Sequence, residues 1–112
     1  MKLKKVVELL NGKSLNNAYA DDTEVFAACG CDLMSDVLAY VKDQALLLTG
    51  LINPQVVRTA EMMDMKAIVF VRGKTPGDEI LSLADDAGIA VITTDFPLYI
   101  ACGKLYSEGL YK

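Results

Sequence analysis

Three uniformly apolar segments of five residues alternate with amphipathic segments through the second half of the chain. They span 45–49, 67–71 and 89–93, and the residues between them carry apolar side chains at helical spacing. Apolar strands that alternate with amphipathic helices are typical of a parallel sheet covered by helices on both faces. We therefore predict an α/β fold, three-layer-like, with a mostly parallel sheet of about four to five strands. At 112 residues, the chain 1–112 is expected to form a single domain.

Each apolar segment leads into a pattern that is typical of a helix start. Asn53 followed by Pro54 places a capping side chain before a residue suited to the first helical turn. Gly88 is a typical helix end. The three helices are predicted at 53–63, 75–88 and 95–105, with Asn53, Thr75 and Asp95 as candidate caps.

The first third of the chain carries weaker signals. Apolar residues at helical spacing predict a helix at 2–10, and the polar segment that follows predicts turns with a brief strand near Leu15. The apolar segment 24–31 predicts a strand, and 32–42 predicts a helix that Asp32 can cap. The position of these strands in the sheet does not follow from the pattern.

The composition excludes several classes of function. The chain contains no histidine, which removes the commonest general base and the commonest metal ligand. Lys plus Arg is 11 and Asp plus Glu is 15, so the net charge of −4 is opposite in sign to that of a typical nucleic-acid module. We predict no catalytic residues, no cofactor and no nucleic-acid partner.

No segment of the sequence predicts a membrane span or a signal peptide. The longest apolar runs, near 45–48 and 67–71, fall far short of the roughly 20 residues that a spanning helix needs. The first ten residues contain three lysines and one glutamate, so no apolar signal core follows the charges. Three cysteines suggest no disulfide framework, and reduced thiols in the cytoplasm are expected.

The carboxyl ends of the predicted strands are where open α/β sheets bind ligands. Arg72 and Lys74 add positive charge there, and glycines allow close approach of the backbone. This rim predicts a site for a phosphate or carboxylate ligand. Pure helix capping is the competing interpretation, above all for Asn53, Thr75 and Asp95. The candidate ligand-binding residues are Thr49, Gly50, Asn53, Arg72, Gly73, Lys74, Thr75, Thr93 and Thr94.

Cys29 and Cys31 form a second candidate site. Two thiols this close can share a metal ion or cycle to a disulfide, although a closed zinc site needs four ligands. Buried cysteines also pack as small apolar side chains. In a strand, both thiols would point to the same face. Packing and redox or metal chemistry therefore both remain open for this pair.

The order of these elements resembles the DRTGG domain family. The most specific part of the resemblance is Asp-Leu-Met-Ser-Asp-Val at 32–37, followed by Thr49, Asn53-Pro54 and Gly73. The motif that names the family lies just before this stretch. Its aspartate aligns with Asp22, but Thr23 stands where it has arginine, Phe26 where it has threonine, and Ala27 and Ala28 where it has two glycines. Any role that depends on that arginine or those glycines is not implied here, and Asp22, Asp32, Ser35 and Asp36 are the positions that match the family. The chain is also similar to the N-terminal domain of HPr serine kinase/phosphorylase. It lacks a phosphate loop, and kinase activity is not implied.

The resemblance implies a regulatory or ligand-sensing domain that pairs with itself and often accompanies a larger enzyme. We therefore expect a non-catalytic homodimer that binds an anionic metabolite or a nucleotide. A protein-interaction module without a ligand is the main alternative, and Tyr99, Tyr106 and Tyr111 are candidates for a dimer contact. A thiol-based redox or metal-binding protein that uses Cys29 and Cys31 is the third hypothesis.

Overall fold

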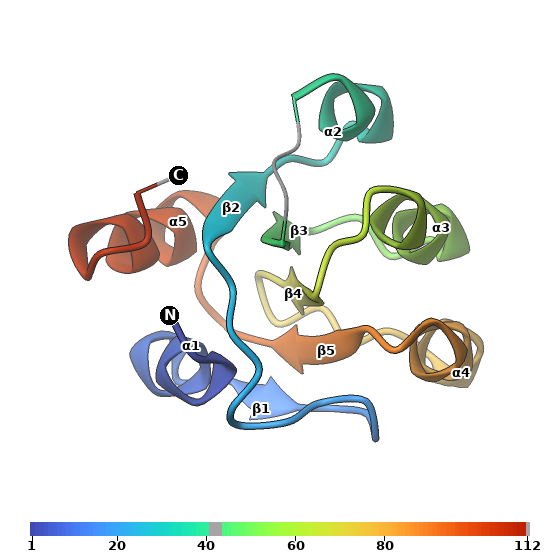
Figure 1. Cartoon of the computed structure of the whole chain (residues 1–112), viewed down its shortest axis with the longest axis horizontal. Coiled ribbons are helices and arrows are strands. Elements are labelled where there is room, and N and C mark those ends of the chain that lie inside the picture. The colour runs from blue at the N-terminus through green and yellow to red at the C-terminus, as the bar shows by residue number, and fades with distance from the viewer. Residues whose placement is uncertain (41–43, 112) are drawn as a thin grey trace.

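A computed structural model describes residues 1–40 and 44–111 as a single α/β domain (Figure 1). Its five-stranded sheet has the order β1-β5-β4-β3-β2. Strands β2 to β5 are mutually parallel, and β1 is antiparallel to β5. The predicted α/β class, with a mostly parallel sheet, is confirmed. The strands are β1 (Lys13–Ser14), β2 (Ala27–Gly30), β3 (Ala45–Thr49), β4 (Ala67–Phe70) and β5 (Ala90–Thr93).

Helices cover both faces of the sheet and give the predicted three layers (Figure 1). α2, α3 and α4 lie on one face, and α1 and α5 lie on the other (Figure 1). The helices are α1 (Leu3–Leu10), α2 (Met34–Tyr40), α3 (Pro54–Met62), α4 (Asp78–Ala87) and α5 (Leu98–Ser107). None of the described helices is long and apolar enough to cross a membrane.

The two central strands explain the uniform apolar pattern. Every residue of β3 and β4 is buried. Leu47 packs with the core under α2, α3 and α4, whereas Leu46 and Leu48 pack with the core under α1 and α5. Successive side chains of a strand point to opposite faces, so a strand between two helical layers must be apolar at every position.

The helix ends agree with the sequence at some caps and not at others. The Asn53 side chain accepts a hydrogen bond of 2.8 Å from the Gln55 amide, and Gly88 ends α4 with a φ of 71°. The predictions for Thr75 and Asp95 as caps are wrong. α4 is preceded by Gly77 and α5 by Pro97, and neither makes a side-chain capping bond. Both helices begin later than predicted, beyond the reach of these two side chains.

The N-terminal third differs most from the prediction. β1 contains two residues and lies just before Leu15, whose amide donates to the Val91 carbonyl at 2.8 Å. Beyond Leu15, the Asn16 side chain makes the hydrogen bonds that the backbone of a longer β1 would make. Its Nδ2 donates to the Ile89 carbonyl and its Oδ1 accepts from the Val91 amide, both at 2.8 Å. The strand is short because this amide group takes over the pairing.

β2 and α2 are also shorter than predicted. Glu24 forms an isolated antiparallel bridge with Lys2, and the Val25 amide donates to the Met1 carbonyl at 2.8 Å, so residues 24–25 pair with the N-terminus instead of the sheet. α2 begins at Met34 and not at Asp32, because the Asp32 carboxylate makes other contacts. Positions 41–42 of the predicted helix lie outside the described residues.

Candidate functional site

Three side chains and one backbone amide come together at the carboxyl ends of β2, β3 and β4. The Asp32 carboxylate accepts from the Thr49 hydroxyl at 2.9 Å and from the Gly50 amide at 2.8 Å. Arg72 Nη2 lies 3.8 Å from the second carboxylate oxygen of Asp32. Parallel strands end at the same edge of the sheet, and for this reason residues far apart in sequence meet here.

Asp32 is held as a carboxylate. The hydrogen bond from the Gly50 amide is the largest cause of a lowered pKa of Asp32. Partial burial raises this pKa and so opposes the shift. The Thr49 hydroxyl and the positive charges of Arg72 and Lys74 lower the pKa further. Thr49 is fully buried, whereas the Asp32 and Arg72 side chains are each about half exposed (50% and 53%). The site therefore presents one negative and two positive groups at the surface.

Arg72 has an unusual backbone for its residue type. Its φ is 59° and that of Gly73 is 69°, and the turn closes through a 3.2 Å hydrogen bond from the Lys74 amide to the Val71 carbonyl. The left-handed region costs a residue with a side chain about 1–2 kcal/mol. The Arg72 amide donates to Phe96 and the Gly73 amide to Thr94, both at 2.9 Å, and these bonds hold the turn. Because those amides are already paired, the charged side chains are the groups left to meet a ligand.

Gly50 makes room for the Arg72 guanidinium. A Cβ at this position would collide with Arg72 Nη2 and would stand 3.1 Å from the central carbon of the guanidinium. The guanidinium therefore lies against the Gly50 backbone at the end of β3. The sequence predicted close approach to the Gly50 backbone by a ligand, and within the chain the group that approaches is Arg72.

A polar hollow of about 310 Å³ lies beside this cluster, at the ends of β4 and β5. The Thr93 hydroxyl donates to the Lys74 carbonyl at 2.7 Å, and the buried Thr94 hydroxyl donates to the Leu10 carbonyl at 2.6 Å. These two hydroxyls position the loops. The residues lining the hollow are Asn11, Lys13, Leu15, Gly73, Thr75, Thr93, Thr94 and Asp95.

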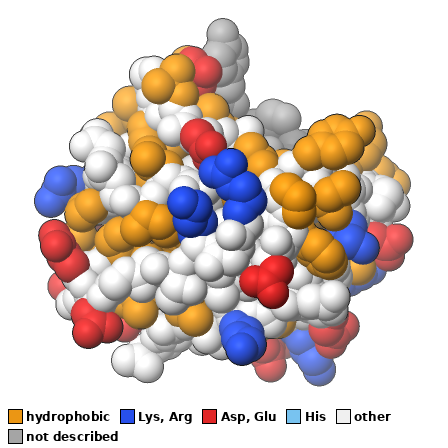
Figure 2. All heavy atoms as spheres, turned by 180° about the vertical axis from the view of Figure 1, so that it is seen from behind, with side chains coloured by type: hydrophobic (Ala, Val, Ile, Leu, Met, Phe, Trp, Pro, Cys, Tyr) orange, Lys and Arg blue, Asp and Glu red, His pale blue; other side chains and the backbone are white. Residues whose placement is uncertain are grey.

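The structure divides most of the predicted site residues into two neighbouring groups. Thr49, Gly50 and Arg72 belong to the cluster around Asp32, and Gly73, Thr75, Thr93 and Thr94 line the hollow. Lys74 lies in the loop between the two groups, where its charge lowers the pKa of Asp32 and its carbonyl accepts from the Thr93 hydroxyl. Asn53 instead caps α3. Sequence reasoning missed Asn11 and Lys13, because they reach the hollow only through the antiparallel pairing of β1 with β5. Figure 2 shows a small group of Lys and Arg side chains near the centre of one face, bordered by acidic side chains.

The residues of the family motif do not form one site. Asp32 belongs to the strand-end cluster. Asp22 pairs instead with Lys2 at 3.6 Å, and its side chain is 92% exposed. Ser35 and Asp36 are exposed in the first turn of α2.

The cysteines are all partly buried. Cys29 and Cys31 pack against the same core cluster, as the strand pattern predicts. The Cys31 thiol donates to the Leu33 carbonyl at 3.3 Å and accepts from the Leu33 amide at 3.4 Å, in the turn before α2. Burial, followed by the nearby Cys29, raises the pKa of the Cys102 thiol. Among residues 1–40 and 44–111, no three Cys, Asp or Glu side chains group closely enough to hold a metal ion.

Comparison with solved structures shows a shared fold. The chain is similar to the CBS and DRTGG domains of the regulatory region of Clostridium perfringens pyrophosphatase, a structure complexed with the activator diadenosine tetraphosphate. The TM-score is 0.77 at 16% sequence identity, over 93% of this chain and 45% of that one. This chain therefore spans less than half the length of that structure. No protein-family model matches the chain, and no curated protein matches it.

Proposed function

We propose that this chain is a non-catalytic regulatory domain of the DRTGG kind, which senses an anionic small molecule at the carboxyl ends of its strands. The observation that carries the proposal is Arg72, which is held in a left-handed turn with its guanidinium across Gly50. Residues kept in an unfavourable backbone conformation cluster at functional sites. Asn or Gly would fit this turn with less strain, so the reason for an arginine lies in its side chain.

The contact between Arg72 and Asp32 leaves the guanidinium available to a ligand. At 3.8 Å it is longer than the 2.7–2.9 Å of a strong charge-assisted hydrogen bond, and both side chains are about half exposed. Such a pair is worth little, about 0–1 kcal/mol. A phosphate or carboxylate can therefore replace the Asp32 carboxylate at Arg72 with little loss, while Lys74 supplies a second positive charge.

The similar pyrophosphatase structure supports the choice of ligand and context. It holds the CBS and DRTGG domains of the regulatory region of a pyrophosphatase, complexed with the activator diadenosine tetraphosphate. We therefore place nucleotides first among the anionic ligands, and we propose that this domain regulates an enzyme to which it is joined or bound.

A thermal-shift titration tests the proposal. The probes are ATP, ADP, GTP, acetyl phosphate, glucose 6-phosphate and inorganic phosphate. A ligand at 100 times its dissociation constant adds about 2.7 kcal/mol, which for a chain of this length raises Tm by about 11 °C. We expect a dose-dependent shift with at least one probe.

Three variants locate the site. Arg72→Ala removes the guanidinium and is expected to abolish the shift. Arg58→Ala, an exposed arginine of α3, is the matched control and is expected to preserve it. Asp32→Asn removes the competing negative charge and is expected to strengthen binding. A flat response to every probe, or a shift that survives in Arg72→Ala, would overturn the proposal.

A further inference from the structure

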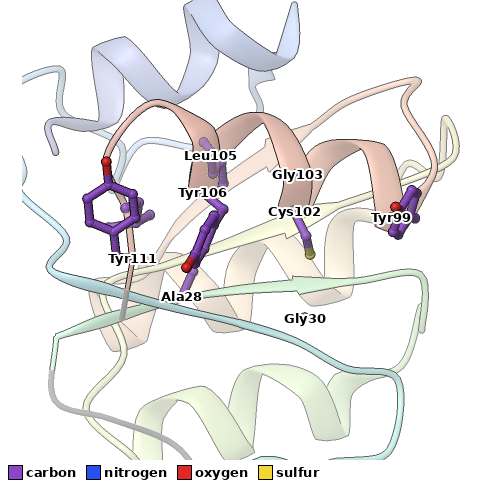
Figure 3. A pocket seen from close by; sticks show the side chains of 9 residues that line it. Ala28, Gly30, Tyr99, Cys102, Gly103, Leu105, Tyr106 and Tyr111 are labelled. Carbon is purple, nitrogen blue, oxygen red and sulfur yellow. The ribbon is translucent and has the colours of Figure 1, made fainter.

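The polar hollow at the ends of β4 and β5 differs in character from a larger hollow between α5 and β2. The larger hollow measures about 470 Å³, and Tyr99, Tyr106 and Tyr111 stand along its rim (Figure 3). Its described lining holds no charged residue. The polar hollow, in contrast, is lined by one lysine and one aspartate, Lys13 and Asp95. It therefore offers both signs of charge to a molecule that enters it.

The side chains of Lys13 and Asp95 are available to a ligand. Both residues are exposed, and among residues 1–40 and 44–111 neither side chain makes a hydrogen bond or an ion pair. The Thr93 and Thr94 hydroxyls in the same lining differ, because each donates to a backbone carbonyl of the chain. The hydroxyls of the hollow thus hold the loops, and its two charged groups are left to meet something else.

Gly73 joins the hollow to the positive charges of the strand-end cluster. It lines the hollow, and in the sequence it stands between Arg72 and Lys74. A Cβ at Gly73 would stand 3.2 Å from Asp95 Oδ1, so this carboxylate lies close to the glycine backbone. The two positive side chains therefore leave the chain on either side of the residue that the Asp95 carboxylate approaches.

The charges of the hollow select the kind of group that can lie in it. Asp95 repels an anionic group and Lys13 repels a cationic one, so a neutral group is favoured. A carboxylate only accepts hydrogen bonds and an ammonium only donates them, whereas a hydroxyl does both. Neighbouring hydroxyls of one molecule can thus donate to Asp95 and accept from Lys13. The anionic group of the same molecule is favoured at Arg72 and Lys74.

The size of the hollow suits a single sugar ring. Its volume of about 310 Å³ lies at the lower end of the roughly 300–1,000 Å³ that is typical of small-molecule pockets. A five-carbon sugar carries neighbouring hydroxyls on one small ring, and its phosphate ester supplies the anion. An apolar metabolite would leave both charged groups of the hollow without a partner.

We propose that this site takes a phosphate ester of a ribose-type sugar. The phosphate meets Arg72 and Lys74, and the neighbouring hydroxyls of the sugar meet Asp95 and Lys13. The inference rests on the proposed function, because it needs the anion to bind at Arg72. A nucleotide and a free sugar phosphate share this chemistry.

Isothermal titration calorimetry of the reduced full chain with matched pairs of probes tests the inference. The pairs are ribose 5-phosphate with 2-deoxyribose 5-phosphate, and ATP with 2′-deoxy-ATP; inorganic phosphate reports on the anion alone. The deoxy probe lacks one hydroxyl and so loses a hydrogen bond to a charged group. We expect it to bind about tenfold more weakly than its partner in at least one pair. The pair that shows this preference identifies the source as a free sugar phosphate or a nucleotide.

Two variants locate the contact with the hydroxyls. Asp95→Ala removes the acceptor, and it is expected to bring the two probes of a pair to equal dissociation constants while the deoxy probe still binds. Asp86→Ala is the matched control, because Asp86 is an exposed carboxylate of α4 outside the hollow. It is expected to keep the tenfold preference. Circular dichroism confirms that each variant is folded.

The outcomes separate this inference from the proposed function. If the probes bind through Arg72 but the ribose and deoxyribose forms bind equally, the inference is overturned and the proposed function stands. The same holds if the preference survives in Asp95→Ala, or if Asp86→Ala abolishes it equally. If none of the probes binds, both are overturned.

Discussion

Replacing Asp32 by alanine removes the acceptor on which the strand-end loops converge. The Thr49 hydroxyl would lose its 2.9 Å acceptor while remaining fully buried, and the Gly50 amide would lose its 2.8 Å acceptor. The Arg72 guanidinium would lose its only acidic partner among the described ion pairs.

The magnitude follows from these contacts. A hydrogen bond to a charged group contributes about 1.5–3 kcal/mol when it is well shielded. The Asp32 side chain is 50% exposed, and its pairing with Arg72 adds little, so we expect a total loss of about 1–2 kcal/mol. The unfolding entropy of a chain of this length, about 2.1 cal/mol/K per residue, converts this loss to a decrease in Tm of about 4–9 °C.

The assay is thermal unfolding by circular dichroism at neutral pH, with Asp86→Asn as control, because Asp86 is an exposed carboxylate of α4. The control is expected to change Tm by no more than about 2 °C. An Asp32→Ala variant that melts with the wild type would refute the reasoning, since it would mean that the buried Thr49 hydroxyl loses nothing with its acceptor.

Three further predictions concern the same loops and one helix cap. The folded state lowers the pKa of Asp32 below its ordinary 3.8, so its stabilisation is complete above about pH 4 and is lost as pH falls through the folded value. Unfolding titrated with pH will show this loss in the wild type and a smaller one in Asp32→Asn. Arg72→Gly relieves the left-handed strain and is expected to raise stability by about 1 kcal/mol in urea unfolding, while it abolishes the response to anions; a loss of stability would contradict the strain argument. Asn53→Ala removes the side-chain cap of α3 and is expected to lower stability by about 1 kcal/mol in the same assay; an unchanged midpoint would mean that the cap contributes nothing.

The fold followed from the sequence where burial leaves a strong pattern. β3 and β4 are buried on both faces, and nothing but a strand between two helical layers requires such a run of apolar residues. β1 gives no such signal, because Lys13 and Ser14 are exposed and their pairing depends on a distant strand. The early end of β1 depends on the Asn16 side chain, which resembles any turn residue in sequence.

The strand-end positions of the candidate residues followed from the sequence, whereas their mutual contacts did not, and their role in binding stays a prediction. Arg72 and Gly50 lie at the strand ends as expected, but their mutual contact depends on a left-handed turn that the residue type does not favour. Helix caps and ligand-binding sites favour the same residue types. For this reason the sequence assigned a cap to Thr75 and Asp95, which instead line the hollow beside Gly73.

The Asn16 side chain has a consequence for assembly. By bonding to both Ile89 and Val91, it occupies the edge of β5 beyond the two-residue β1, and the exposed Lys13 lies on β1 itself. This edge therefore offers little backbone to a neighbouring strand. A filament of paired strands needs a sheet that can be extended at both edges, and the Asn16 side chain closes one of them.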